Sequence, residues 1–326
     1  MPTARTELQK LGDETRPYYE KFWGIITPYQ DELWRYCRKL AGNPWDGEDL
    51  FQDTILKMFT SLSSLSHREQ PVHPRAFLFR VATNHWIDIC RKRKMQSEKQ
   101  QDSPAAAEEL DIETPLDIRD AFETLLAHLP PRQTVVLVLV DAFQFTVREA
   151  ADIVGTTEGA VHAALFRARG TLRQLAAKEN AEGEDAGRAS LAPKPDPALV
   201  ERYVSCFNSR DFQGIADLLA DNAVYSFVTQ SSKEYGKSAI MKASHNPSHY
   251  ERRDLQAFVM ELWGRQAAVF CKVRPDGTPE ALNEVIALET EDDHIVYLSG
   301  YFFCPSFMEA AALQLGLPRE EWQCAE

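Results

Sequence analysis

The chain contains 326 residues, of which 44% are hydrophobic and 26% are charged, and its formal net charge is −13. The length exceeds that of one ordinary hydrophobic core and indicates two or three domains. The charge is uneven, because residues 1–180 carry a net charge of −3 and residues 181–326 carry −10. An acidic second half is a poor surface for nucleic acids, so any polyanion binding must come from local patches in the first half.

The sequence also argues against a membrane protein, a secreted protein and a protein built on zinc or disulfides. The longest apolar run, Val135–Val140, is far shorter than the ~20 residues that span a bilayer. The N-terminal residues contain no apolar core of a signal peptide. The six cysteines are scattered without a C-x-x-C pair, which argues against a zinc site or a disulfide framework. We expect a cytoplasmic protein that binds no metal and no cofactor.

Two segments of low hydrophobicity divide the chain. Residues 96–117 are rich in acids, and residues 179–196 are rich in Gly, Pro, Ala and charge. Both compositions are typical of linkers. We therefore expect three folded blocks, at residues 1–95, 118–178 and 197–326.

The first block is predicted to be helical. Apolar residues recur every three or four positions in DGEDLFQDTILKMFTSL, and again in PRAFLFRVATNHWIDIC after the helix-start signal of Pro74. The second of these segments carries aromatic rings and the amide of Asn84, and it runs into the four cations Arg91–Lys94. Such a composition is used to hold an unpaired nucleic-acid strand. A core helix with a solvated charged end is the alternative interpretation.

The second block is also predicted to be helical. A buried helix is expected in LPPRQTVVLVLVDAF and a short amphipathic helix in TVREAADIV, followed by a turn at Gly155 and a last helix in EGAVHAALFRARGTLRQL. A short helix, a glycine turn and a second helix form a helix-turn-helix pattern. The cations on the last helix favour DNA binding over the alternative, which is a plain helical hairpin with a solvated basic face.

The third block changes its periodicity. An amphipathic helix is expected in ALVERYVSCFNSRDFQGIADLL, and strands in AVYSFV, LQAFVMELW, QAAVFCKV, ALNEVIALET and HIVYLSGYFF. A helix followed by a meander of antiparallel strands predicts an α+β domain. The predicted fold class is therefore multidomain, with two all-α domains and a C-terminal α+β domain.

The helical segments in residues 28–178, with their order and spacing, resemble bacterial sigma factors of the sigma-70 family, in the extracytoplasmic-function (ECF) group. The resemblance implies that the first segment docks on the β′ clamp helices of RNA polymerase core. It implies that the second segment melts and reads the −10 promoter element. The helix-turn-helix would be region 4, which reads the −35 element and touches the β flap.

The resemblance also implies roles for individual residues. The residues expected to bind core polymerase are Asp49, Gln52 and Asp53. The residues expected to contact −10 DNA are Arg80, Val81, Asn84, Asp88, Arg91, Lys92, Arg93 and Lys94. The residues expected to contact −35 DNA are Thr157, His162, Ala163, Phe166, Arg167 and Arg169. An amide can pair with a base edge once the base has left the stack, and the cations would neutralise phosphates beside it.

The recognition helix departs from the family pattern. His162, Ala163 and Ala164 stand where the family often has basic or hydroxylic residues. Fewer hydrogen-bond donors are then available for base edges, so we expect weak or unusual recognition of the −35 element.

The third block resembles a SnoaL-like domain of the nuclear-transport-factor-2-like superfamily, in which a curved sheet and helices enclose a conical pocket. Tyr225, Trp263, Glu284 and Tyr301 would line that pocket. In sigma factors with this fusion the extra domain substitutes for a separate anti-sigma protein, which implies contact with regions 2 and 4. The D-G-G-G-R motif of the best-known such group is replaced here by VTQSSKEYGKS, so the mechanism of that group cannot be transferred.

We therefore expect an ECF-type sigma factor with a fused regulatory domain that catalyses nothing. Strand alternation alone explains the polar residues of the third block, and Asn246-Pro247 separates His245 from His249, which disfavours a metal pair. The alternative is a ligand-sensing or enzymatic domain that is tethered to an ordinary DNA-binding regulator.

Overall fold

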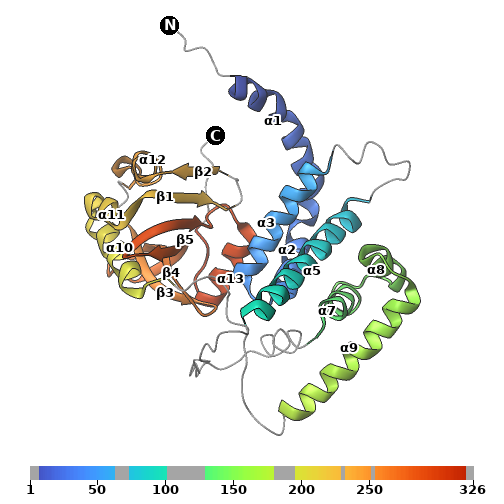
Figure 1. The fold of residues 1–326 in the computed structure, drawn as a ribbon. Coiled ribbons are helices and arrows are strands. Elements are labelled where there is room, and N and C mark those ends of the chain that lie inside the picture. The colour runs from blue at the N-terminus through green and yellow to red at the C-terminus, as the bar shows by residue number, and fades with distance from the viewer. Residues whose placement is uncertain are drawn as a thin grey trace. The chain divides into compact units, whose positions relative to one another are not determined.

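The computed structural model describes residues 7–62, 73–100, 129–179, 195–228, 232–250 and 254–320. The chain forms two compact units, Met1–Arg188 and Ala189–Glu326 (Figure 1). Most of the two predicted linkers lies outside the described residues. The part of the first linker that is described, residues 96–100, continues a helix, because Gln, Glu and Lys are good helix formers.

The first group of helices in the first unit contains α1 (Glu7–Ile26), α2 (Gln30–Ala41), α3 (Pro44–Thr60) and α5 (Pro74–Gln100). The 3-10 turn η1 (Thr27–Tyr29) joins α1 to α2. Helix α3 begins at Pro44, two residues before the predicted segment, because the Asn43 side chain accepts a hydrogen bond from the Asp46 amide and Pro44 follows the cap. Gly47 lets α2 and α3 approach, because a Cβ there would lie 2.6 Å from the Arg38 Cα.

The second group of helices in the same unit contains α7 (Pro131–Leu137), the π-helical η2 (Val138–Ala142), α8 (Val147–Val154) and α9 (Glu158–Glu179). The predicted helix-turn-helix is confirmed. Thr146 and Glu149 form a capping box at the start of α8, and Gly155 ends it with φ 70°. Helices α7 and α8 also pack against α5, so the two helical groups belong to one compact unit.

The second unit has the predicted α+β architecture. Its helices are α10 (Pro197–Ser209), α11 (Phe212–Leu218), α12 (Lys237–Lys242) and α13 (Pro305–Leu315), with a 3-10 turn η3 (Pro247–Tyr250). Its strands are β1 (Leu219–Phe227), β2 (Ser232–Tyr235), β3 (Leu255–Leu262), β4 (Arg265–Val273), β5 (Pro279–Glu291) and β6 (His294–Gly300).

The six strands form one sheet in the order β2-β1-β6-β5-β4-β3. Neighbouring strands are antiparallel except β1 and β6, which are parallel. One face of the sheet packs on α10, α11 and α12 through a core that includes Tyr203, Phe207 and Phe270 (Figure 1). Phe307 of α13, by contrast, packs against Trp263 and stacks on Tyr301, outside that core.

Candidate functional site

Helix α3 presents two of its three predicted docking residues to solvent. Asp49 and Asp53 are exposed, whereas Gln52 is half-buried. The Gln52 amide donates to the buried Glu48 carboxylate at 2.6 Å, and the Trp34 indole donates to the other oxygen of the same carboxylate at 2.6 Å. The amide of Gln52 therefore hydrogen-bonds a buried carboxylate between α2 and α3. In this it differs from Asp49 and Asp53, whose side chains are exposed.

A histidine on α5 is held by two side chains of α3. The Asp53 carboxylate lies 2.8 Å from Nε2 of His85, and the Lys57 ammonium contacts Nδ1. Because an ammonium can only donate, Nδ1 is the acceptor and Nε2–H donates to Asp53. This contact ties the predicted docking helix to the predicted −10 helix one residue away from Asn84.

The polar residues predicted for −10 DNA lie along one side of α5. Arg80 and Val81 are half-buried, and Asn84, Asp88 and Arg91 are exposed. Their spacing of three or four residues places them on one helical face. The aromatic residues Phe77, Phe79 and Trp86, by contrast, are at most 8% exposed. The expectation that these rings offer stacking surfaces is wrong, because they alternate with the polar residues and face the core.

The cationic end of α5 is partly neutralised within the chain. Arg91 pairs with Asp88 at 3.2 Å, and Arg93 pairs with Asp46 at 3.7 Å. Lys92 and Lys94 are exposed. The basic segment is therefore a helical surface with two internal carboxylate partners, and its positive charge is smaller than its sequence suggests.

The recognition helix α9 divides its residues between a core face and an exposed face. His162, Ala163, Phe166 and Arg167 are exposed, and Phe166 reaches 82% exposure. Ala164, which is 8% exposed, faces the core with Val161, Leu165 and Ala168. The Thr157 hydroxyl accepts from the Ala160 amide and so caps the helix.

Arg169 differs from its neighbours on α9. Its Nη2 and Nε lie 2.6 and 3.1 Å from the two carboxylate oxygens of Asp141. A bidentate pair of this kind fixes the guanidinium in place. The structure therefore gives Arg169 a contact with η2, although its side chain remains 48% exposed.

Two of the predicted pocket residues, the buried Tyr225 and the half-buried Glu284, form a polar pair in the second unit. The Tyr225 hydroxyl donates to Glu284 at 3.1 Å. Burial raises the pKa of Glu284 to about 7, and the hydrogen bond from Tyr225 opposes that rise. A Cβ on Gly300 would lie 2.6 Å from the Tyr225 hydroxyl, so glycine at this position makes room for the pair.

A second buried pair lies beside the first and was not predicted. The Tyr203 hydroxyl lies 2.7 Å from Nε2 of His245, and the rings of Tyr225 and His245 are 5.8 Å apart. Burial lowers the pKa of His245 to about 4. Sequence reasoning considered His245 only as a metal ligand with His249, because nothing in its local pattern points to Tyr203, 42 residues away.

The other two predicted pocket residues, Trp263 and Tyr301, contact Phe307 of α13, with ring centroids 5.4 and 4.1 Å away. That all four residues line one pocket stays a prediction. Within the described residues, no group of three His, Cys, Asp or Glu side chains is arranged to hold a metal ion.

Comparison with known proteins identifies the helical unit. Residues 25–95 match the family described as Sigma-70 region 2, and residues 119–172 match Sigma-70, region 4. The ECF RNA polymerase sigma factor EcfG of Rhodopseudomonas palustris is 30% identical over 156 residues, which cover 45% of this chain and 80% of that protein. The chain belongs to the ECF RNA polymerase sigma factors. It therefore acts in transcription initiation, with RNA polymerase and promoter DNA as its partners.

The likeness to other sigma factors extends beyond the helical unit. The ECF sigma factor SigG of Mycobacterium tuberculosis is 27% identical over 276 residues, which cover 76% of this chain and 72% of that protein. An alignment of that length extends into the second unit, which begins at Ala189.

Solved structures that match this chain include a sigma factor and an NTF-2 like protein. The M. tuberculosis sigma factor SigJ covers 84% of this chain and 95% of its own, with 19% identity and a TM-score of 0.32. An NTF-2 like protein of Burkholderia xenovorans covers 39% of this chain and 86% of its own, with 15% identity and a TM-score of 0.26.

The site residues predicted for this sigma factor lie mostly on exposed parts of helices. On α5, Arg80, Asn84, Asp88 and Arg91 share one face, and all six residues predicted for −35 DNA, from the cap residue Thr157 to Arg169, are exposed. Gln52 and Arg169 instead contact residues of their own chain. Glu48 and His85, which position these faces, were missed as positioning residues because their partners lie on other turns or other helices.

Among the described helices, none has the length and apolarity needed to cross a membrane.

Proposed function

We propose that this sigma factor docks on the β′ clamp helices of core polymerase through Asp49 and Asp53 of α3. The support for this is that both carboxylates are exposed on one helix, where they can meet basic partners. Gln52 has an indirect role, because its amide is bonded to Glu48. The proposed domain bounds remain 1–95 for region 2, 118–178 for region 4 and 197–326 for the regulatory domain.

Helix α5 binds the −10 element in this proposal. The observation that carries this proposal is the exposed amide of Asn84, between Arg80 and the cations Arg91–Lys94 on one helix. A flipped base presents its edge to the amide, and the cations neutralise the neighbouring phosphates. Val81, half-buried one turn away, supplies an apolar wall.

Helix α9 binds the −35 element, and region 4 also contacts the β flap of core polymerase. Its exposed face offers the Phe166 ring, the His162 imidazole and the Arg167 guanidinium. An apolar ring can contact a thymine methyl group, whereas only His162 and Arg167 supply hydrogen bonds to base edges. Recognition of the −35 element is therefore weak in this protein.

The second unit regulates the sigma factor in place of a separate anti-sigma protein, through contact with regions 2 and 4. Its acidic charge supports this role, because it disfavours the approach of DNA. In this proposal it catalyses no reaction, because the alternation of residues along the strands is enough to explain polar residues such as Tyr225 and Glu284 as part of the core. The alternative is a ligand-sensing or enzymatic domain, and the cluster of two buried pairs is the observation that favours it.

A binding experiment with purified core polymerase tests the docking proposal. We expect the full chain, and more strongly a chain truncated after residue 196, to form a complex. Asp49→Lys should abolish binding, since it places a cation against a basic partner, and Gln52→Ala should weaken it less. Glu20→Gln, on the exposed surface of α1, is the matched control. Equal binding by Asp49→Lys and the control would exclude α3 as the docking helix.

The same complexes test the role of α5. Asn84→Ala should retain core binding and lose promoter opening, which permanganate reactivity of unpaired thymines measures. Normal opening by Asn84→Ala would refute the base-reading role of the amide. If the truncated chain does not bind core polymerase, the result favours the alternative function, an ordinary DNA-binding regulator.

A further inference from the structure

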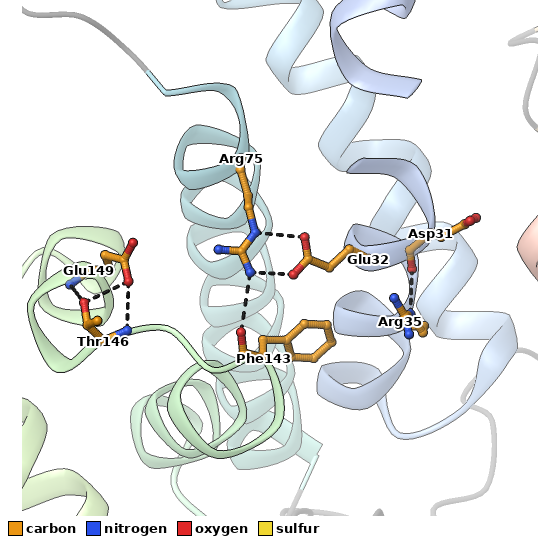
Figure 2. Close-up of polar contacts among 7 residues, drawn as sticks. All are labelled: Asp31, Glu32, Arg35, Arg75, Phe143, Thr146 and Glu149. Carbon is orange, nitrogen blue, oxygen red and sulfur yellow. Dashed lines mark hydrogen bonds and ion pairs between the residues drawn. The ribbon is translucent and has the colours of Figure 1, made fainter. Parts of the chain in front are cut away.

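Helix α5 is anchored to its neighbours at two levels. In its first turn, Nε and Nη2 of Arg75 lie 2.8 and 2.5 Å from the two carboxylate oxygens of Glu32 on α2 (Figure 2). A bidentate pair of this kind fixes the helix at that end. Further along α5, His85 meets α3 through Asp53 and Lys57. Because Arg75 already holds α5 in place, the contact of His85 can serve a purpose besides joining two helices.

The imidazole of His85 stands between two opposite charges of α3. Its Nε2 donates to Oδ2 of Asp53 at 2.8 Å, and its Nδ1 accepts from the Lys57 ammonium. Asp53 and Lys57 lie four residues apart on one helix, a spacing at which an acid and a base otherwise pair directly. The side chain of His85 is only 12% exposed, so the packing of α5 on α3 keeps the ring in this position.

This arrangement sets the direction of the Asp53 carboxylate. The contact with His85 uses Oδ2, so Oδ1 can accept a hydrogen bond from a basic partner. The Asp53 side chain remains 58% exposed, and the exposed Asp49 lies one turn earlier on the same helix. A side chain that is oriented before binding loses less conformational freedom when its partner arrives. His85 therefore presents Asp53 in a form that is ready for docking.

We propose that His85 is a positioning residue for core docking, which holds Asp53 away from Lys57 and orients its carboxylate for a basic side chain of core polymerase. The proposal rests on the proposed docking function of α3. It gives a residue of the −10 helix, next to Asn84, a role in binding core polymerase. Without the imidazole, Asp53 pairs with Lys57, and the negative charge that it offers to a partner is reduced.

The test measures the affinity of the full chain for purified core polymerase and, on the same samples, the midpoint of urea unfolding. His85→Leu removes both hydrogen bonds and keeps an apolar side chain against α3. It should weaken core binding about threefold to tenfold, the range for hydrogen bonds to a half-exposed charge. The midpoint should not fall, because leucine is the better helix former. His73→Leu, at an exposed histidine just before α5, is the matched control and should bind like the wild type.

Two rescue variants separate positioning from packing. His85→Gln should bind core polymerase within about twofold of the wild type, because the glutamine amide supplies a donor for Asp53 and an acceptor for Lys57. Lys57→Gln, added to His85→Leu, should restore most of the lost binding, because it removes the cation that competes for Asp53. Lys57→Gln alone should change core binding little.

Unchanged core binding in His85→Leu would overturn the positioning role. A loss that follows a lowered urea midpoint, and that neither His85→Gln nor Lys57→Gln rescues, would overturn it as well. Where His85→Leu does not fold, His85→Ala takes its place with the same expected outcomes. Asp53→Lys distinguishes the two proposals. If it abolishes core binding while His85→Leu keeps it, only the role of His85 is overturned; if it binds like the wild type, the proposed docking function fails, and the role of His85 fails with it.

Discussion

The residues singled out in the two compact units of this sigma factor lie in opposite environments. In the helical unit, Asn84, Arg91 and Phe166 are exposed on helical faces. In the α+β unit, Glu284 and His245 are held inside the protein by tyrosine hydroxyls. Exposed groups contribute to binding when a partner arrives, whereas ionisable groups whose pKa values are shifted by burial make the stability of the fold depend on pH. Variants of the first unit should therefore change promoter binding, and variants of the second should change folding.

The largest expected effect is on promoter binding. Replacing the four cations of residues 91–94 by glutamine should flatten the salt dependence of holoenzyme binding, by roughly 0.7 to 0.9 log units per lost phosphate contact. At ~0.1 M salt the affinity should then fall by about 30-fold to 1,000-fold, for two to four contacts. The lower limit applies if the pairing of Arg91 and Arg93 with carboxylates persists.

Promoter binding measured from ~0.05 to 0.3 M KCl gives that slope. Core binding should stay as in the wild type, because these cations lie on α5 and not on α3. An unchanged slope would show that the basic end of α5 is a solvated surface.

A smaller effect is expected on the stability of the second unit. The pKa of Glu284 is raised to about 7 in the folded state, so it keeps its proton while the unfolded chain, with an ordinary carboxyl pKa near 4.5, has lost it. Stability then falls as pH rises from about 4.5 to 7, by a total of about 3 kcal/mol. Glu284→Gln should remove that loss and make the unit more stable at pH 8.

The opposite slope of His245 sharpens this test. The pKa of His245 in the folded state is about 4, which lies below the ordinary value of 6.5. The contribution of His245 to the stability of the fold is therefore lost as pH falls from about 6.5 to 4. The free energy of unfolding of residues 189–326, measured by urea denaturation, should thus be nearly independent of pH between about 4.5 and 6.5 in the wild type. In Glu284→Gln it should rise with pH over the same range. Glu291→Gln, exposed at the end of the same strand, should keep the wild-type profile.

Removal of the second unit should change activity severalfold. A tether holds the unit near regions 2 and 4 at an effective concentration on the order of millimolar, so weak contacts suffice to oppose holoenzyme formation. Truncation near residue 196 should raise single-round transcription and tighten core binding. If truncations at residues 180, 196 and about 300 are all less active than the full chain, the second unit is an activator or a folding partner.

The smallest expected effect separates two arginines of α9. Arg167→Ala should weaken promoter binding and relax specificity at the base pair that it contacts. Arg169→Ala should leave that specificity unchanged and lower stability by about 1 kcal/mol or less, because its partner is the half-exposed Asp141. Equal loss of specificity in both variants would show that Arg169 leaves Asp141 to contact DNA.

Much of the helical unit could be predicted because its signals are local. The helix-turn-helix follows from the capping box of Thr146 and Glu149 and from the turn at Gly155, all within ten residues. The exposed face of α5 follows from the 3.6-residue period of its apolar positions. For the same reason, the α+β class of the second unit was predictable from its change to a two-residue period.

The sequence by itself therefore determined the helices, the order of the elements and which helical faces meet solvent, because these depend on residues within one or two turns. Only the tertiary structure decided which polar groups find one another across the fold. Arg75 meets Phe143 across 68 residues, Tyr225 meets Glu284 across 59, and Arg169 meets Asp141 across 28. Such pairs depend on the directions in which separate elements pack, and a local pattern carries no record of those directions.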